Sequence, residues 1–172
     1  MKKPFILLSL YILCSCNYNK EILTTNIYST ANRTPMGTVE FFDTSKGLLV
    51  KVQVENLSEG EHGFHIHNNP SCENILDKNG KLQLGLGAGG HYDPDNTQKH
   101  LGPNNTSGHK GDLPSLKADA DGFANNKFYL KYLKLSDIKN RSIIIHAGGD
   151  NYSDTPNSLG GGGERIACGI IE

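Results

Sequence analysis

Seven side chains of the kind that bind metal ions place the strongest constraint on how this chain can fold. They are six histidines and one aspartate, at His65, His67, His91, His100, His109, Asp112 and His146. Their grouping and spacing are those that two adjacent metal ions require. The sequence therefore predicts a dinuclear metal site, to which the fold must bring all seven side chains.

The seven side chains divide into two sets. His65 and His67 are two residues apart, so in an extended segment both imidazoles project from the same face and can reach one ion. The second set is His91, His100, His109 and Asp112. It lies in a stretch rich in Gly, Pro, Asn and Asp, which favours a loop. Its three nitrogens and one carboxylate form a closed four-ligand set that suits structural zinc. Three histidines remain for the other ion, and they suit either copper or a catalytic zinc.

Long ordered runs of sequence surround these side chains. The chain resembles the bacterial copper,zinc superoxide dismutases from Glu61 to Pro114 and again from His146 to Gly169. The matching runs are His62–His67, Ser71–Cys72, Ala88–Pro94, Lys99–Pro103, Gly108–Pro114, Ile145–Asn151 and Gly160–Gly169. No ligand position departs from the family pattern.

The resemblance assigns a metal to each set, with one copper ion and one zinc ion per subunit. It implies copper at His65, His67, His91 and His146, and zinc at His91, His100, His109 and Asp112. His91 would bridge the two ions as an imidazole that has lost both ring protons, which two flanking cations make easier. The resemblance also implies that Asp150 links a copper ligand to a zinc ligand, and that Arg165 borders the copper and guides the anion. His62 points away from the copper side, and we interpret it as structural.

The activity that the resemblance implies is the disproportionation of superoxide anion to dioxygen and hydrogen peroxide. Copper would transfer the electrons while His91 takes up and returns a proton, so His91 and Arg165 are the predicted catalytic residues. Zinc does not change oxidation state, and its role would be to orient His91 and order the loop. Such an enzyme protects against superoxide outside the cytoplasm.

Three other functions would each require a feature that this sequence lacks. A copper or zinc buffer would favour soft Met-rich or Cys-rich sites, yet the chain has only Met1 and Met36. A dismutase-like adhesin or structural domain that has lost copper would lack a ligand or the arginine, and none is missing. Hydrolysis at a three-histidine zinc would need an added general base, and the sequence offers no clear one.

Two glycine runs could be mistaken for phosphate-binding motifs. Gly85–Gly90 satisfies the dinucleotide pattern G-x-G-x-x-G, but His91–Asn96 follows it with a proline where a helix should begin. Gly160–Gly163 lacks the Lys-Ser or Lys-Thr of a phosphate loop. Four glycines instead permit a tight backbone path that returns Arg165 towards the metals.

The cysteines and the N-terminus indicate an exported protein. Cys72 and Cys168 resemble the family's disulfide pair, and the alternative is two buried free thiols in a reducing compartment. Lys2 and Lys3 precede a short apolar run, as in an export signal. Leu13–Cys16 resembles a lipoprotein cleavage box with lipid on Cys16. The rival is plain secretion with a disordered N-terminus.

These signals predict three segments: a lipoprotein signal peptide at residues 1–15, a flexible tether at 16–26 and the catalytic domain at 27–172. The expected location is the periplasm or cell envelope, with a lipid anchor in the membrane. Loss of Lys2 and Lys3 moves the net charge from −1 to −3, so no basic domain remains to suggest nucleic acid. Both a monomer and a homodimer are compatible with the family.

Short β-patterns separated by Gly and Asn turns fill the body of the chain. Leu48, Val50, Val52 and Val54 alternate with polar residues, which is typical of a half-buried strand. Further strands are expected at 38–42, 63–67, 123–130, 142–146 and 165–171, with a helical turn near 135–138. This pattern predicts an all-β antiparallel sandwich or barrel. The resemblance narrows it to an immunoglobulin-like Greek-key β-barrel with long metal-binding loops.

Overall fold

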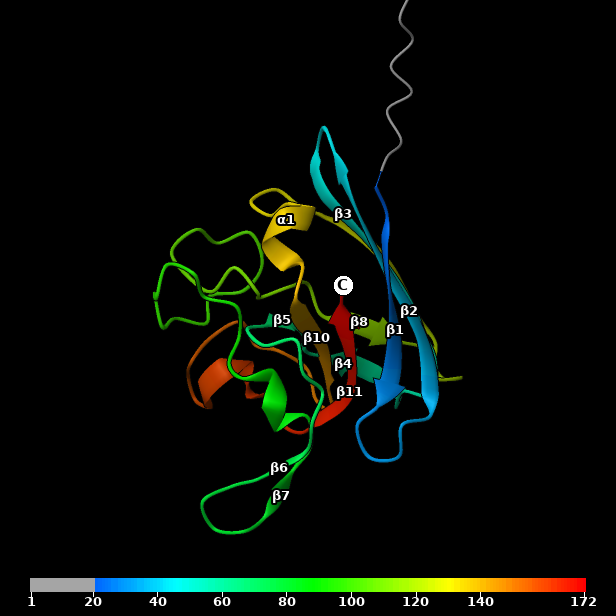
Figure 1. Ribbon diagram of the computed structural model, residues 1–172, viewed down its shortest axis with the longest axis vertical. Coiled ribbons are helices and arrows are strands. Elements are labelled where there is room, and N and C mark those ends of the chain that lie inside the picture. Colours follow the sequence, from blue (N-terminus) through cyan, green and yellow to red (C-terminus); the bar gives the residue numbers. More distant parts are fainter. Residues whose placement is uncertain (1–20) are drawn as a thin grey trace, which may run out of the picture.

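A single large antiparallel sheet forms the body of the protein. The computed structural model describes residues 21–172, and Figure 1 shows how the strands curl around a common interior. The sheet has seven strands in the spatial order β5, β10, β11, β1, β2, β3, β9. Their bounds are β1 Leu23–Ser29, β2 Pro35–Thr44, β3 Gly47–Val54, β5 Phe64–His67, β9 Ala124–Leu130, β10 Arg141–His146 and β11 Arg165–Ile171.

A second, two-stranded sheet lies between the two ends of the large one. Its strands are β4 (Gly60–His62) and β8 (Leu116–Ala118), which pair antiparallel. β4 runs almost directly into β5, and β8 packs against β9. The small sheet therefore bridges the two edge strands of the large sheet and closes the barrel, as expected for an all-β Greek-key fold.

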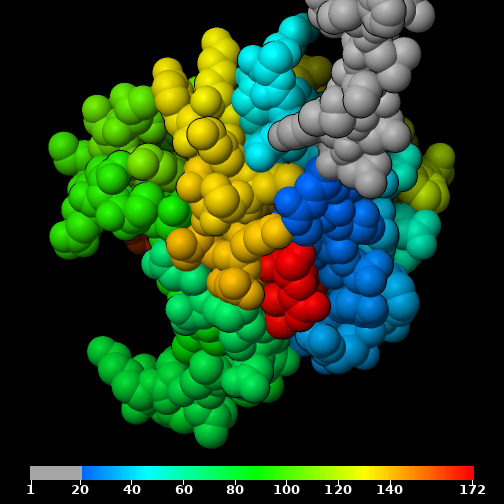
Figure 2. All heavy atoms as spheres, turned by 45° about the horizontal axis from the view of Figure 1, so that its top comes forward, coloured from blue at the N-terminus to red at the C-terminus, as the bar shows by residue number. Residues whose placement is uncertain are grey.

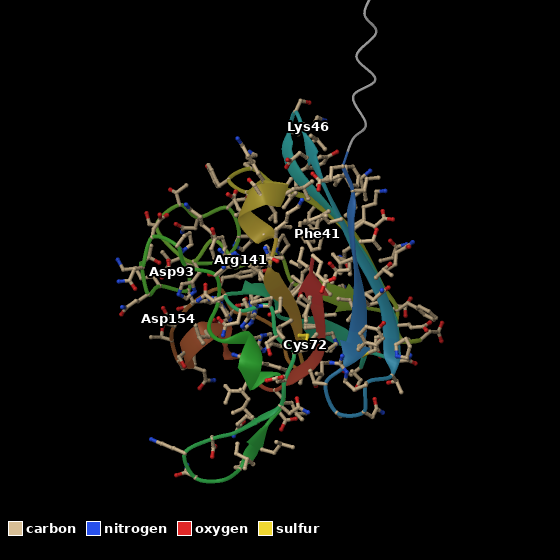
Figure 3. All side chains as sticks on the ribbon, viewed as in Figure 1. Phe41, Lys46, Cys72, Asp93, Arg141 and Asp154 are labelled. Atoms are coloured by element: carbon tan, nitrogen blue, oxygen red, sulfur yellow. A yellow bond between two sulfur atoms is a disulfide. The ribbon has the colours of Figure 1, made fainter. Side chains whose placement is uncertain are left out.

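Alternating side chains fill the interior of this barrel. Val39 and Phe41 of β2, Val50 and Val52 of β3 and Ile143 of β10 are fully buried and belong to one hydrophobic core. Figure 3 labels Phe41 in that interior. For β3, this inward set is the one that the period of two in the sequence predicted.

The remaining elements lie in the connections. They are the helical turn α1 (Leu135–Ile138), the 3₁₀ turns η1 (Leu86–Ala88) and η2 (Ser158–Gly161), and the hairpin of β6 (Ile75–Leu76) and β7 (Leu82–Gln83). The hairpin projects from the body of the molecule, as Figures 1 and 2 show. The long segment from 84 to 115 contains no strand of the barrel, so its folding depends on other contacts.

One predicted boundary is wrong. Residues 23–26, which the sequence pattern assigned to a flexible tether, belong to β1 and pair with β2. The alternation was hard to see because a polar residue, Thr25, takes an inward position and is 2% exposed. The ordered domain therefore begins before residue 27. Within residues 21–172, no helix has the length and apolar character needed to cross a bilayer.

Candidate metal centre

Adjacent strands position the first three histidines. His65 and His67 lie on β5, and His146 ends β10, the antiparallel neighbour of β5. His65 pairs with Ile144, which is two residues from His146, so the side chains of His65 and His146 share a face. Their ring centroids are 4.9 Å apart.

The loop from 84 to 115 supplies the other four side chains. His91 forms an isolated bridge with His67, and Asp112 forms one with His65. Two buried groups of four possible ligands result, and within each group the ligand atoms lie within 4.8 Å of one another. One group is His65, His67, His91 and His146, and the other is His91, His100, His109 and Asp112. Both contain His91, as the two-ion prediction requires.

A closed ring of three backbone hydrogen bonds holds the loop against β5. The Ile66 N–H donates to the Gly111 carbonyl, the Gly111 N–H to the Tyr92 carbonyl, and the Tyr92 N–H to the Ile66 carbonyl, at 2.8–2.9 Å. Each of these residues is a direct neighbour of a metal-site side chain. A Cβ at Gly111 would overlap the Ile66 carbonyl oxygen, so this close approach requires glycine. The sequence contains no signal for this ring.

Asp150 links one histidine of each group through hydrogen bonds. The Nε2 of His65 donates to Asp150 Oδ2 and the Nε2 of His100 donates to Oδ1, both at 2.7 Å. These bonds direct the Nδ1 atoms of both rings towards the metal positions, since an imidazole's hydrogen-bonded nitrogen fixes which one can bind a metal. Gly160, with φ of 74°, packs directly on Asp150 and leaves no room for a Cβ. Asp150 thus lies where the resemblance implied.

The group expected to bind copper has the donor atoms that a metal needs. The Nδ1 of His67 donates to the Gly89 carbonyl and the Nδ1 of His146 to the Gly163 carbonyl, at 2.9 and 3.2 Å. Buried ring nitrogens without a hydrogen-bond partner remain on three of the four histidines: His65 Nδ1, His67 Nε2 and His146 Nε2. Unpartnered buried nitrogens are costly unless a ligand satisfies them.

Burial also favours the neutral form of His67, His91 and His146. Desolvation, with a smaller contribution from the neighbouring histidines, lowers the pKa of His91 to about 4 and the pKa of His146 to about 3. The pKa of His67 is likewise held well below its ordinary value by burial. Because a metal ligand must be deprotonated, neutral imidazoles are ready to bind an ion at neutral pH.

The second group is built around the Asp112 carboxylate. Its oxygens lie 2.9 Å from His91 Nδ1, 3.0 Å from His100 Nδ1 and 3.3 Å from His109 Nδ1. Burial alone would raise the pKa of Asp112, but the close approach of His100 and His109 and the hydrogen bond from His91 hold it far below its usual range. Burial likewise opposes the charge on His100, yet the nearby Asp112 carboxylate and the hydrogen bond to Asp150 raise its pKa to about 9.

Three imidazole nitrogens and one carboxylate are a four-ligand donor set of the kind that zinc prefers. The Nδ1 atoms of His100 and His109 are buried and have no hydrogen-bond partner, and a cation beside Asp112 would satisfy both of them. The donor set therefore fits the metal that the sequence predicted there.

An open cavity leads to the first group. It has a volume of about 390 Å³, and His91, His146, Arg165 and the glycine run 161–163 line it. The Arg165 guanidinium donates to the carbonyls of Gly85 and Gly89, at 2.8 and 2.7 Å, and these bonds fix its position. Arg165 is therefore a fixed positive charge beside two histidines of the first group, and it can attract and hold a small anion.

The remaining predicted residues lie around this centre. His62 is buried, and its ring nitrogens lie 2.7 Å from the carbonyl oxygen of His146 and 2.9 Å from that of Ser58, away from both groups, in agreement with a structural role. Cys72 and Cys168 form a disulfide, whose sulfur atoms are visible in Figure 3. The bond connects the start of the metal-binding segment to β11, the strand that begins with Arg165. Cys16 lies outside the described residues.

Comparison with known proteins gives the same picture. The model of the family described as copper/zinc superoxide dismutase matches residues 35–171. The superoxide dismutase [Cu-Zn] of Brucella melitensis is 47% identical over 176 residues, which cover 100% of both chains.

Solved structures are similar as well. The Cu/Zn superoxide dismutase from Brucella abortus superposes with a TM-score of 0.84 at 49% identity, covering 88% of this chain and 100% of that one. The monomeric copper, zinc superoxide dismutase from Salmonella enterica superposes with a TM-score of 0.74 at 42% identity, covering 89% of this chain and 99% of that one.

Proposed function

The chain belongs to the copper/zinc superoxide dismutase family, and we propose that it holds copper at His65, His67, His91 and His146 and zinc at His91, His100, His109 and Asp112. It is an enzyme that disproportionates two superoxide anions, with two protons, into dioxygen and hydrogen peroxide. The observation that carries the residue assignment is the pair of buried donor groups that share His91.

Copper, when bound, supplies the one-electron redox chemistry of the reaction, and zinc supplies a fixed positive charge that orients the ligands. The chain's own residues do the rest. Arg165 lines the cavity, and its guanidinium binds the superoxide anion next to His91 and His146. Because the Nδ1 of His91 is directed at Asp112, its Nε2 is the atom that takes up and returns a proton on the cavity side.

Two reciprocal substitutions test the metal assignment. We expect His146→Ala to lose copper and the activity while retaining zinc, and His109→Ala to lose zinc first, because each side chain belongs to one group alone. Metal content after dialysis, together with superoxide consumption before and after copper loading, measures this. Full activity in a copper-free preparation, or loss of the same metal from both variants, would contradict the assignment.

We further propose that the protein works in the cell envelope as a lipoprotein. Residues 1–15 are the proposed signal peptide, and the new N-terminal Cys16 carries the lipid. The tether then extends from Cys16 to the start of β1 at Leu23. The basic and apolar leader supports export, and the Cys72–Cys168 disulfide suits an oxidising compartment.

The two N-terminal cysteines offer a matched test of this anchor. Cys16→Ser should abolish incorporation of labelled palmitate and release the protein from the membrane fraction, whereas Cys14→Ser should change neither. Equal labelling of both variants would exclude Cys16 as the lipidation site. Superoxide dismutase activity should be the same in both, because both positions precede the folded domain.

A further inference from the structure

One arginine outside the metal site connects three of the segments that surround it. Arg141 begins β10, and its side chain is half-buried. Its Nε donates to the carbonyl of Asp137 in α1 at 2.7 Å, and its Nη1 donates to the carbonyl of Asn68 at 3.1 Å. The centre of its guanidinium lies 3.7 Å from the centroid of the Tyr92 ring. Figure 3 labels Arg141 between α1 and the loop that carries Asp93.

Two of these partners adjoin metal-site histidines. Asn68 directly follows His67, and Tyr92 directly follows His91. Tyr92 is 8% exposed, and its backbone belongs to the ring of three hydrogen bonds with Ile66 and Gly111. The ring bonds hold the backbone of Tyr92 and do not involve its side chain.

The Arg141 guanidinium packs on the face of the Tyr92 ring. A planar cation stacked on an aromatic face at this distance is favourable, and it gains further when it is partly shielded from water. The two hydrogen bonds to carbonyls hold the plane of the guanidinium in place, so the Tyr92 ring meets a fixed surface. Lysine could supply the charge at this position, but not the plane or the two directed N–H groups.

We propose that Arg141 is a positioning residue for the metal centre: it clamps Tyr92 and thereby sets the position of the neighbouring His91 between the two ligand groups. The inference rests on the proposed bridging role of His91. A shift of the His91 ring would alter its geometry to both ions at once. The effect of removing Arg141 should therefore appear in metal retention and in the coupling between the two sites, and not in stability alone.

The test compares Arg141→Gln and Arg141→Lys with a matched arginine elsewhere. Arg33 also lies over a tyrosine, Tyr28, at 5.4 Å, but it is exposed in the turn between β1 and β2. Arg33→Gln therefore removes the same kind of contact outside the metal-binding loop. Tyr92→Phe keeps the ring and should behave like the parent protein.

Two measurements separate positioning from general destabilisation. The first is the rate at which a chelator removes zinc from the copper- and zinc-loaded protein. We expect about a tenfold increase for both Arg141 variants, at the lower end of what loss of a supporting residue does to metal affinity. The second is the magnetic coupling of two Cu(II) ions after zinc-free protein is loaded with Cu(II) at both sites. We expect the Arg141 variants to gain the resonance signal of uncoupled Cu(II).

Every outcome bears on the proposal. If the parent protein itself shows no coupling, the bridging role of His91 is wrong, and the inference that depends on it is wrong with it. If the parent is coupled and the Arg141 variants match Arg33→Gln in both zinc release and coupling, Arg141 does not position the site. Rescue by Arg141→Lys would show that charge alone is sufficient and would overturn the clamp.

Discussion

Reduction of the Cys72–Cys168 disulfide should cost this fold much of its stability. The two cysteines are 96 residues apart, and the loop that they close contains most of the metal-binding residues and the strands β6 to β10. In the chain-entropy model, closing a loop of this length removes enough freedom from the unfolded chain to stabilise the native state by about 4.7 kcal/mol. For a domain of this size, that corresponds to a fall in melting temperature of about 9 to 19 °C on reduction.

The assay is urea unfolding of the oxidised and the reduced protein. Both forms should be metal-free, because a bound metal stabilises the native state by mass action and would hide the difference. Cys14→Ser and Cys16→Ser are introduced into all samples so that no other thiol is present. The difference in free energy of unfolding, obtained by linear extrapolation, is the quantity compared with the model.

A variant without the cross-link provides the control. Cys72→Ala with Cys168→Ala should unfold with the low stability of the reduced protein and should not respond to a reductant. A difference of less than about 1 kcal/mol between the oxidised and reduced forms would refute the reasoning, since the chain-entropy estimate is several times larger. It would mean that the reduced, unfolded chain already keeps these segments close together.

Two further predictions concern the metal centre. Gly111→Ala should lower the free energy of unfolding by about 1 to 3 kcal/mol and weaken zinc binding, because the added Cβ would overlap a backbone carbonyl of β5. Gly90→Ala is the control and should do neither, because its Cβ would meet no atom within 4 Å. Equal melting temperatures and equal zinc titrations for the two variants would contradict this prediction. The stability of the metal-free protein should rise with pH up to about 6.5 and then fall towards pH 9. Burial places the pKa of His91 near 4 and that of His146 near 3, so below pH 6.5 the unfolded chain binds more protons than the fold and stability rises with pH. The pKa of His100 is raised to about 9, so its proton stabilises the fold at lower pH, and this contribution is lost as the pH rises towards 9. Urea midpoints from pH 3 to pH 9 measure this, and a flat profile would exclude it.

Most of the strands could be predicted from the sequence, because their signal is local. The inward side chains of β3, Leu48, Val50, Val52 and Val54, alternate with polar residues, and the structure buries all four. β1 was missed because Thr25 takes an inward position and breaks the apolar pattern. A buried threonine is tolerated there by the tertiary environment, which a pattern of single residues does not contain.

The metal site also has a part that local sequence predicts and a part that depends on contacts between distant segments. The spacing of His65 and His67 alone places both on one face of a strand, and a loop rich in Gly and Asn is free to wrap an ion. The pairing of β5 with β10, which brings His146 beside His65, depends on contacts between distant segments. Sequence periodicity describes one element at a time and does not determine which elements become neighbours.

The sequence by itself determined the chemistry of this protein: which donor atoms it carries, which of them are close along the chain, and which family pattern they follow. The tertiary structure decided how those donors meet. The ring of backbone bonds through Gly111, the Asp150 bridge between His65 and His100, and the clamp of Arg141 on Tyr92 all join residues far apart in sequence. Such contacts form only when the core has packed, because the energy that offsets the entropy of closing long loops comes from burial of the whole barrel.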